Sequence, residues 1–267
     1  MNRLDASVIR QALEGFSIGK EVRVFETVGS TNQTALDLAR QGAPGGTVVL
    51  ANLQLAGQGR RGKRWFSPPD VNLYCSVILR PPIPAALAPF FTFIASVALA
   101  EALEGWGVRP GIKWPNDILI HKKKIAGVLA DALTAGDRVE AVVLGVGVNL
   151  NVSQTALAAG LGPEAQSAIA LRDVAGTDVD RTEFAIRFLR RLAAWYDRFL
   201  EEGQAAGVKA WAGWDLVTGR RVMVREDGHS IEGTALGVDE HGYLIVETLP
   251  GETARVISGE VRLPDHP

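Results

Sequence analysis

Residues 57–69 read Gly-Gln-Gly-Arg-Arg-Gly-Lys-Arg-Trp-Phe-Ser-Pro-Pro. The first six match the Gly-x-Gly-x-x-Gly pattern of dinucleotide-binding folds, in which the last glycine opens a helix after a strand. Residues 47–52 read as such a strand, but Pro68 and Pro69 exclude the interior of a helix. No acidic residue stands about 20 positions further on, where a ribose contact would need one. The stretch therefore argues against a doubly wound dinucleotide-binding fold.

The same stretch predicts a loop that binds an anion. Glycines let main-chain N–H groups approach a ligand, and arginine forks match carboxylate and phosphate oxygens. Four cations crowd the loop at Arg60, Arg61, Lys63 and Arg64. A solvated basic surface turn is the alternative for a charge run of this kind. The glycine spacing and the motifs elsewhere in the chain favour the ligand-binding interpretation.

The segments around the loop predict a mixed α+β fold. Residues 71–80 alternate with apolar side chains on one face, and residues 124–133 and 139–150 read as two long antiparallel strands. Helices are predicted over residues 5–14, 33–40, 85–104 and 180–202, and further strands over residues 21–26, 111–114 and 117–120. Because regular βαβ alternation is missing, we expect a largely antiparallel sheet that carries helices.

From residue 220 the pattern changes to short strands. They are predicted at residues 220–225, 230–238, 243–247 and 254–258, with tight turns at Asp227-Gly228 and His241-Gly242. This pattern predicts a small β-barrel, so we expect two domains, residues 1–216 and 217–267.

Composition narrows the function. Lys and Arg total 28 against 30 Asp and Glu, a net charge of −2, so the local positive charge suits a small anion better than DNA. The single cysteine, Cys75, is expected to be a buried hydrophobe, and the four scattered histidines predict no metal cage. The start is no signal peptide, and the apolar run at residues 90–100 is shorter than the roughly 20 residues that span a bilayer. We expect a cytoplasmic protein.

Five clusters outside the loop could carry chemistry, and most have a plain structural alternative. Residues 30–32 (Ser-Thr-Asn) could simply cap a helix, and Gln54 could be an ordinary surface side chain. Residues 113–117 (Lys-Trp-Pro-Asn-Asp) could be a turn. Lys124 ends a lysine run but enters an apolar strand, where it could project over a site. The glycines in residues 145–149 (Gly-Val-Gly-Val-Asn) permit close approach of a ligand.

In this order the motifs resemble those of the biotin protein ligases, which attach biotin to biotin-dependent carboxylases. The resemblance is carried by residues 30–32, Gln54, residues 57–65, 113–117, 124–127 and 145–149. It implies the class II synthetase-like catalytic fold of that family and a C-terminal SH3-like β-barrel. The first predicted strand begins at residue 21, so we expect the type without an N-terminal DNA-binding domain, and no sequence-specific DNA binding.

The resemblance also implies a two-step reaction. Biotin and ATP form biotinyl-5′-adenylate and pyrophosphate, and a lysine of a biotin carboxyl carrier protein then attacks the adenylate and releases AMP. Two unit charges 4 Å apart repel by about 4 kcal/mol at an effective dielectric near 20, so cations must offset the approach of a carboxylate to a polyphosphate. An ionised carboxylate needs no general base.

The resemblance assigns residues to these tasks. The expected catalytic residues are Arg60, Lys124 and Asp117. The expected biotin-binding residues are Ser30, Thr31, Asn32, Gln54, Gln58, Gly59, Arg60, Lys124 and Gly127. The expected ATP-binding residues are Arg60, Arg61, Lys63, Arg64, Trp65, Asn116, Asp117, Lys124 and Asn149, with Mg²⁺ expected near Asp117. Gln58 departs from the arginine common in the family, and a nucleotide contact by Arg262 stays open.

Two alternatives stay open as well. One is a lipoate or octanoate ligase or transferase of the same fold, against which residues 113–117 and the β-rich C-terminus favour biotin. The other is a non-enzymatic module that binds a ligand or nucleic acid, which the net charge disfavours. We expect a monomer or homodimer, with residues 141–148 able to pair across a dimer. The loop should be mobile until ligand binds and should then exclude water.

Overall fold

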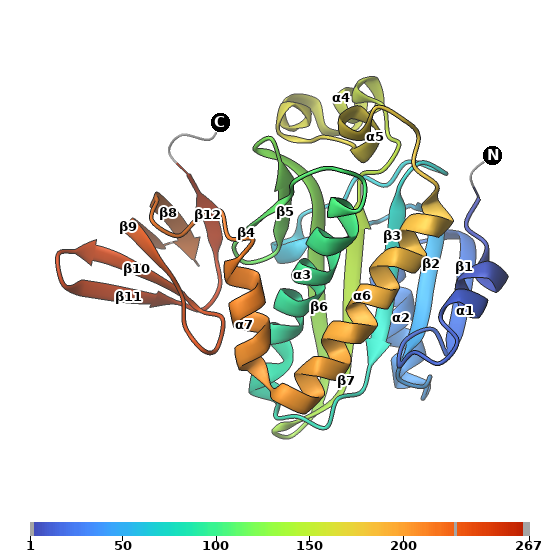
Figure 1. The fold of residues 1–267 in the computed structure, drawn as a ribbon, viewed down its shortest axis with the longest axis horizontal. Helices are drawn as coiled ribbons and strands as arrows, with labels where there is room; N and C mark the ends of the chain where they lie inside the picture. The colour runs from blue at the N-terminus through green and yellow to red at the C-terminus, as the bar shows by residue number, and fades with distance from the viewer. Residues whose placement is uncertain (1–2, 227–228, 264–267) are drawn as a thin grey trace.

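The computed structural model describes residues 3–226 and 229–263. This part of the chain forms two sheets, and helices cover the larger one (Figure 1). The larger sheet has the strand order β1-β2-β3-β7-β6-β5-β4, and the smaller sheet has the order β11-β10-β9-β8-β12.

The larger sheet is mixed and largely antiparallel, as the sequence predicts. Its strands are β1 (Glu21–Val28), β2 (Thr47–Gln54), β3 (Leu73–Leu79), β4 (Gly111–Lys113), β5 (Asp117–Ile120), β6 (Lys123–Ala135) and β7 (Arg138–Val148). β1 and β2 pair in parallel, and every other neighbouring pair is antiparallel. The prediction that residues 141–148 could pair across a dimer is wrong, because β7 lies inside the sheet between β3 and β6. It has no free edge to offer.

Helices cover both faces of this sheet. The α-helices are α1 (Ala6–Ala12), α2 (Thr31–Arg40), α3 (Phe91–Glu104), α4 (Gln154–Leu161), α5 (Leu171–Ala175), α6 (Arg181–Glu202) and α7 (Gln204–Ala212). Short 3₁₀ turns are η1 (Arg60–Gly62), η2 (Ala85–Phe90) and η3 (Gly162–Ser167). α3, α6 and α7 pack on one face of the sheet, and α2 packs on the other through Ala35 and Ala39 (Figure 1). α6 begins as predicted, with the Asp180 side chain accepting from the Glu183 N–H.

The predicted helix over residues 85–104 differs in its first part. Pro89 has no N–H to donate, so the segment starts as the 3₁₀ turn η2 and becomes α-helical only at Phe91. Together the two elements form a 20-residue helical segment, Ala85–Glu104, that is long and apolar enough to cross a membrane by composition alone. This segment is longer than residues 90–100, the apolar run identified in the sequence. Because 72% of its most apolar 18-residue window is buried in the protein, we interpret it as a core helix.

The smaller sheet is an open antiparallel sheet. Its strands are β8 (Arg221–Glu226), β9 (His229–Val238), β10 (Leu244–Leu249), β11 (Glu252–Val256) and β12 (Glu260–Arg262). In the described residues β11 and β12 are its two edges, so the predicted SH3-like barrel is not closed. The predicted turn at His241-Gly242 is present, with Gly242 at φ +80°. The turn predicted at Asp227-Gly228 lies outside the described residues.

Candidate active site

The start of α2 and the end of β2 form an uncharged polar patch on the sheet. Ser30 takes the N-cap position of α2 without a capping hydrogen bond from its side chain, so the plain helix-cap interpretation does not hold. Gln54 Oε1 accepts from the Thr31 N–H at 2.8 Å and from Thr31 Oγ1 at 3.1 Å. Gln54 Nε2 donates to Ser67 Oγ at 2.9 Å, and Ser76 Oγ donates to Thr31 Oγ1 at 2.9 Å. Gln54 is therefore a fixed part of the patch and not a free surface side chain.

Asn32 extends this patch to a carboxylate that the motifs do not include. Asn32 Nδ2 donates to the carboxylate of Asp131 on β6. Burial raises the pKa of Asp131, and the hydrogen bond from Asn32 offsets that effect only in part. A Cβ at Gly145 would lie 2.7 Å from Asn32 Oδ1, so the first glycine of residues 145–149 makes room for the amide. The sequence gives no signal for Asp131 except a polar residue that interrupts an apolar strand.

Residues 57–65, hereafter the basic loop, fold back as a small hairpin. The Gly59 N–H donates to the Lys63 carbonyl at 2.7 Å, and the Trp65 N–H donates to the Gly57 carbonyl at 2.9 Å. A Cβ at Gly57 would lie 2.5 Å from Ser67 Oγ, so this glycine allows the loop to pack closely on its own base. Gln58 is exposed and forms a backbone bridge to Arg64.

Arg60 joins the basic loop to residues 113–117. Its Nη1 donates to Asn116 Oδ1 at 3.1 Å, and Asn116 Nδ2 donates to the Val128 carbonyl at 2.8 Å. Burial lowers the pKa of Arg60, while the carboxylate of Asp117 opposes that change. Guanidinium groups stay charged in proteins, so Arg60 places a partly buried positive charge beside Asn116.

Lys124 and Asp117 form the central ion pair of the site. Lys124 Nζ lies 2.6 Å from Asp117 Oδ1, and Lys113 Nζ lies 3.5 Å from Asp117 Oδ2. Burial alone would raise the pKa of Asp117, but the two ammonium groups outweigh it and hold that pKa below its ordinary value. Asp117 is therefore ionised at neutral pH and holds both lysines in place.

A β-bulge in β6 brings Lys124 over the same surface as Gly127. Ile118 pairs with Ala126, but Leu119 pairs with Lys124, so Ile125 is the extra residue. Regular alternation would point residues 124 and 127 to opposite faces. With the bulge, a Cβ at Gly127 would lie 3.4 Å from Lys124 Nζ.

The ring of Trp65 packs on the glycines of the site. A Cβ at Gly147 would lie 2.5 Å from Trp65 ring atoms, and one at Gly127 would lie 3.5 Å from the ring. Lys124 Nζ lies 5.4 Å from the ring centroid. The Trp65 Nε1 is buried and has no hydrogen-bond partner among the described residues. The ring thus covers the surface that strands β6 and β7 leave open.

The other predicted residues lie apart from this centre. Lys63 Nζ pairs with Glu260 Oε2 at 2.9 Å, Arg61 Nη1 donates to the Arg225 carbonyl at 3.1 Å, and Arg64 Nη2 donates to the Leu55 carbonyl at 3.4 Å. Asn149 is buried, and its Oδ1 accepts from Asn72 Nδ2 at 3.4 Å. Arg262 is exposed on β12.

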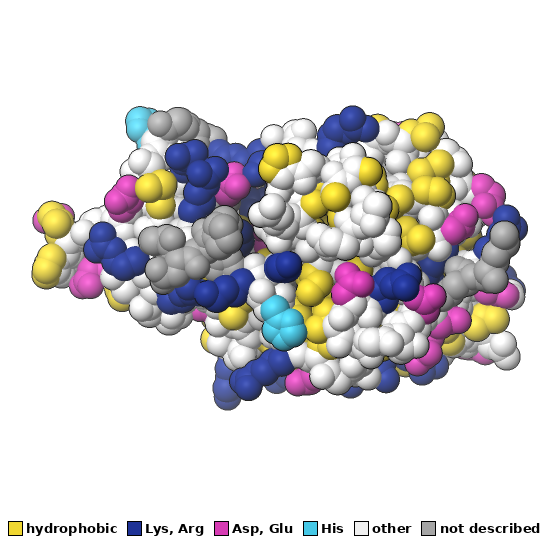
Figure 2. Space-filling view, turned by 90° about the horizontal axis from the view of Figure 1, so that it is seen from above, with side chains coloured by type: hydrophobic (Ala, Val, Ile, Leu, Met, Phe, Trp, Pro, Cys, Tyr) yellow, Lys and Arg dark blue, Asp and Glu magenta, His cyan; other side chains and the backbone are white. Residues whose placement is uncertain are grey.

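A hollow of about 500 Å³ lies where the basic loop meets the smaller sheet. Its lining residues are Arg61, Lys63, Arg225, Glu226, His229, Ser230 and Glu260. Seen from above, many Lys and Arg side chains lie on and beside the end of the molecule that carries this sheet (Figure 2). Arg60 donates to Asn116, whereas Arg61 and Lys63 bond to Arg225 and Glu260 on the smaller sheet, so positive charge of the loop lies at two places.

Two family models and several known proteins match this chain. The model of the "Biotin/lipoate A/B protein ligase family" matches residues 24–149, and that of the "Biotin protein ligase C terminal domain" matches residues 217–263. The chain is 36% identical over 220 residues to a biotin–[acetyl-CoA-carboxylase] ligase of Paracoccus denitrificans, covering 81% of this chain and 90% of the relative. It is 33% identical over 262 residues to the bifunctional ligase/repressor BirA of Bacillus subtilis, covering 98% of this chain and 79% of the relative.

A solved structure is similar over most of the chain. The biotin protein ligase from Aquifex aeolicus in complex with biotin and ATP aligns with a TM-score of 0.75 at 26% identity. The alignment covers 91% of this chain and 98% of that one.

Proposed function

Because the chain belongs to the biotin protein ligase family, we propose that it activates biotin with ATP as biotinyl-5′-adenylate. It then transfers biotin to a lysine of a biotin carboxyl carrier protein. The observation that carries this proposal is that Trp65 links the charged group to the uncharged patch. Lys124 Nζ lies 5.4 Å from the centroid of its ring, and the carbonyl of this tryptophan accepts from Ser67 Oγ, which in turn accepts from Gln54 Nε2.

The uncharged patch suits the head of biotin. A ureido group has neutral N–H donors and a carbonyl acceptor, and neutral side chains can satisfy it without burying a charge. We assign this role to Ser30, Thr31, Asn32, Gln54 and Gly127, together with the backbone of Gln58 and Gly59. The side chain of Gln58 is exposed and uncharged. The cationic contact that an arginine would make at this position in the family therefore has no equivalent in this chain.

The first chemical step brings negative charges together. A carboxylate oxygen of biotin attacks the α-phosphorus of ATP, and pyrophosphate leaves. Arg60 and Lys124 offset the repulsion and stabilise the charge that develops on the phosphate oxygens. Asp117 positions Lys124 through their 2.6 Å contact, and Asn116 positions Arg60. Asn149, Trp65, Arg61, Lys63 and Arg64 are proposed as further nucleotide contacts.

The second step needs a dry site. The amine of the carrier lysine attacks the carbonyl carbon of the adenylate, and AMP leaves with the bridging oxygen. A mixed anhydride reacts with water, so the basic loop and the ring of Trp65 must cover it until the carrier arrives. The packing of Trp65 on Gly147 supports this role.

Magnesium would accompany ATP. The described residues contain no group of three or more His, Cys, Asp or Glu side chains that could hold a metal ion. Asp117 is held by two ammonium groups, which compete with a cation for its oxygens. The residues present therefore do not fit a protein-held magnesium site, and oxygens of the ATP phosphates would be the main ligands.

We propose a cytoplasmic enzyme, monomer or homodimer, in which residues 1–216 bind biotin and ATP and residues 217–267 form the second domain. We also propose that it lacks sequence-specific DNA binding, in line with the net charge of −2. The lipoate or octanoate alternative is less favoured, because the C-terminal match is to a biotin protein ligase domain.

Covalent labelling of a carrier tests the proposal. The protein is incubated with biotin, Mg-ATP and a purified biotin carboxyl carrier domain, and the mass of the carrier is followed. We expect the mass of one biotin on the carrier and none on a control carrier whose acceptor lysine is replaced by arginine. An unlabelled carrier, or labelling by lipoate or octanoate in place of biotin, would refute it.

A further inference from the structure

Arg181, the first residue of α6, is a buried charge that the proposed chemistry does not use. Its side chain has no exposed surface. Burial lowers the pKa of Arg181, and the nearby Asp70 opposes that change more than any other group. A buried guanidinium costs free energy unless hydrogen bonds replace its water, so its partners indicate what it holds.

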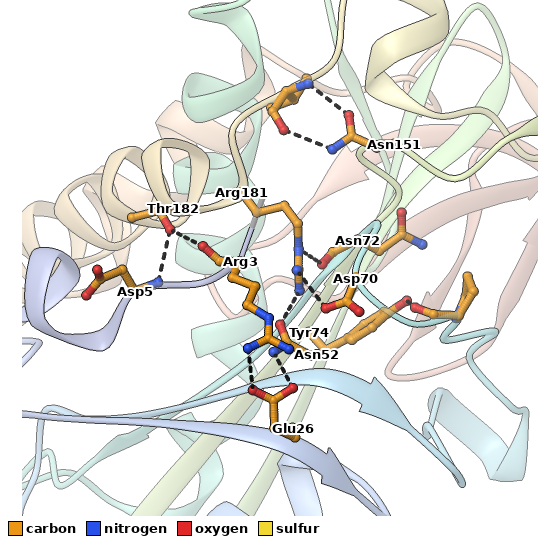
Figure 3. A network of polar contacts seen from close by, with 12 residues as sticks. Arg3, Asp5, Glu26, Asn52, Asp70, Asn72, Tyr74, Asn151, Arg181 and Thr182 are labelled. Atoms are coloured by element: carbon orange, nitrogen blue, oxygen red, sulfur yellow. Dashed lines mark hydrogen bonds and ion pairs between the residues drawn. The ribbon is translucent and has the colours of Figure 1, made fainter. Parts of the chain in front are cut away.

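The partners of Arg181 come from the two ends of the segment that carries the basic loop. Nη2 donates to Asn52 Oδ1 at 3.0 Å, on β2 just before the loop. Nε donates to the Asn72 carbonyl at 2.9 Å, and Nη1 lies 3.7 Å from Asp70 Oδ1, both just after the loop. Figure 3 shows the guanidinium between these residues.

Other bonds close the base of this segment. The Asp70 N–H donates to the Asn52 carbonyl at 3.0 Å, so the two ends also bond to each other. The Tyr74 hydroxyl donates to the Pro68 carbonyl at 2.7 Å and ties the returning chain to β3. The hydrogen-bonded base contrasts with the exposed tip, where Arg61, Lys63 and Arg64 lie.

Asn72 connects the same base to the end of β7. Its Oδ1 accepts from the Leu150 N–H at 3.0 Å, and its Nδ2 donates to Asn149 Oδ1 at 3.4 Å. Asn149 is one of the proposed nucleotide contacts. One guanidinium thus fixes the root of the basic loop relative to the strand on which the ring of Trp65 packs.

We infer that Arg181 is a positioning residue that holds both ends of the loop-bearing segment, so that the basic loop closes over bound ligand in one register. A loop that opens and closes needs fixed ends, because a small shift at the root becomes a larger shift at Arg60. Misplacement of a reacting group by about 1 Å can cost about 100-fold in rate. The inference rests on the proposed function for its kinetic consequence only.

Two variants test it. Arg181→Lys keeps the charge but loses the fork that reaches Asn52 and Asn72 together. Asp70→Asn removes the charge of an exposed partner, and asparagine tolerates the positive φ of +60° found there. The matched control is Arg198→Lys, on the exposed face of the same helix, where Arg198 pairs with Glu202.

The measurements are cutting by trypsin after residues 60, 61, 63 and 64, and the half-life of biotinyl adenylate without carrier. We expect Arg181→Lys to raise loop cleavage without ligand and to shorten the adenylate half-life by about tenfold or more. Asp70→Asn should change both in the same direction by a smaller factor with little change in Tm, and Arg198→Lys should match the wild type.

A lowered Tm with unchanged loop cleavage and unchanged adenylate half-life would show that Arg181 is only structural. If Arg181→Lys fails to fold, an Asp70→Asn variant identical to the wild type in both measurements overturns the inference. If the wild type forms no adenylate, the proposed function fails, and loop cleavage alone still decides the role of Arg181.

Discussion

Lys124 holds the central place among the charged groups of the site. Its ammonium contacts Asp117, lies near the ring of Trp65 and borders Gly127. It is therefore within reach of the loop, of residues 113–117 and of the surface of β6. Its neighbour Lys123 belongs to the same lysine run but is exposed. Variants of Lys123 and Lys124 can therefore be compared, because the two residues have the same charge and nearly the same sequence context.

Lys124→Ala should lower the rate of adenylate formation by about 100-fold or more, because a charge that stabilises the transition state is lost. The rate is measured by pyrophosphate exchange with biotin. Lys123→Ala should stay within about twofold of the wild type, as exposed surface substitutions usually do. Equal losses in the two variants would contradict the assignment of Lys124.

Asp131 gives a prediction for the dependence of stability on pH. Its pKa is raised in the folded protein, so between the ordinary value and the raised one the folded state binds more protons than the unfolded state. Through that window its contribution lowers the free energy of unfolding as pH rises. Asp131→Asn should remove this fall while keeping an acceptor for Asn32. Urea unfolding of both proteins across the window measures it, and superimposable pH profiles would contradict it.

The structure brings many of the motif residues together, but the contacts of Asp131 and Ser76 with them could not be found from sequence. Lys124, Asp117 and Gln54 stand in ordered motifs whose spacing is informative. A single polar residue in an apolar strand gives the same sequence pattern whether its side chain contacts a neighbouring residue or faces solvent. Only the pairing of β6 with β7 and the packing of α2 bring Asp131 to Asn32.

At the scale of secondary structure, the site depends on how the basic loop packs on β6 and β7. Glycines at residues 127 and 147 leave a surface without side chains, and the ring of Trp65 lies on it. The β-bulge at Ile125 places Lys124 on that surface. These features bring the basic loop to a defined place on the larger sheet.

Gly147→Ala should displace the ring of Trp65, because the added Cβ would lie 2.5 Å from ring atoms. We expect the KM for biotin to rise by about tenfold and Tm to change by a few degrees or less. The double variant Gly147→Ala with Trp65→Phe has a smaller ring and should recover part of the loss. A KM unchanged by Gly147→Ala would mean that the ring does not cover the ligand.

The periodicity of apolar residues predicted the long helices and strands better than it predicted the bulges and short helices between them. The long strands β6 and β7 and the helix α6 follow the sequence pattern closely, since each has a continuous apolar face. The bulge at Ile125 leaves no mark in the sequence, because one extra residue between apolar neighbours preserves their composition. The short helices α4 and α5 were not predicted, because neither has a long apolar face.

At the scale of the whole molecule, the smaller sheet contacts the segment that holds Asn116 and Asp117. Trp114 Nε1 donates to the Gly242 carbonyl at 3.0 Å, and the Trp114 side chain is buried. The smaller sheet also contacts the basic loop, because Lys63 pairs with Glu260 on β12. The sequence predicted the short strands but not that their sheet stays open, because closure depends on whether the edge strands meet.

Trp114→Phe should therefore act on nucleotide binding through the interface between the sheets. Loss of one buried hydrogen bond should lower the free energy of unfolding by about 1 to 3 kcal/mol. We expect the KM for ATP to rise severalfold with a smaller change in the KM for biotin, measured by steady-state exchange. Equal changes in the two values would contradict a specific effect on residues 113–117.

The central claim is that this site joins biotin to AMP, and pyrophosphate exchange tests it most directly. Purified protein is incubated with Mg-ATP, labelled pyrophosphate and biotin, lipoate or octanoate in separate reactions. The label should enter ATP with biotin alone, and Lys124→Ala should lower that exchange by about 100-fold or more. Exchange with lipoate or octanoate but not with biotin, or no exchange with any of the three acids, would contradict the claim.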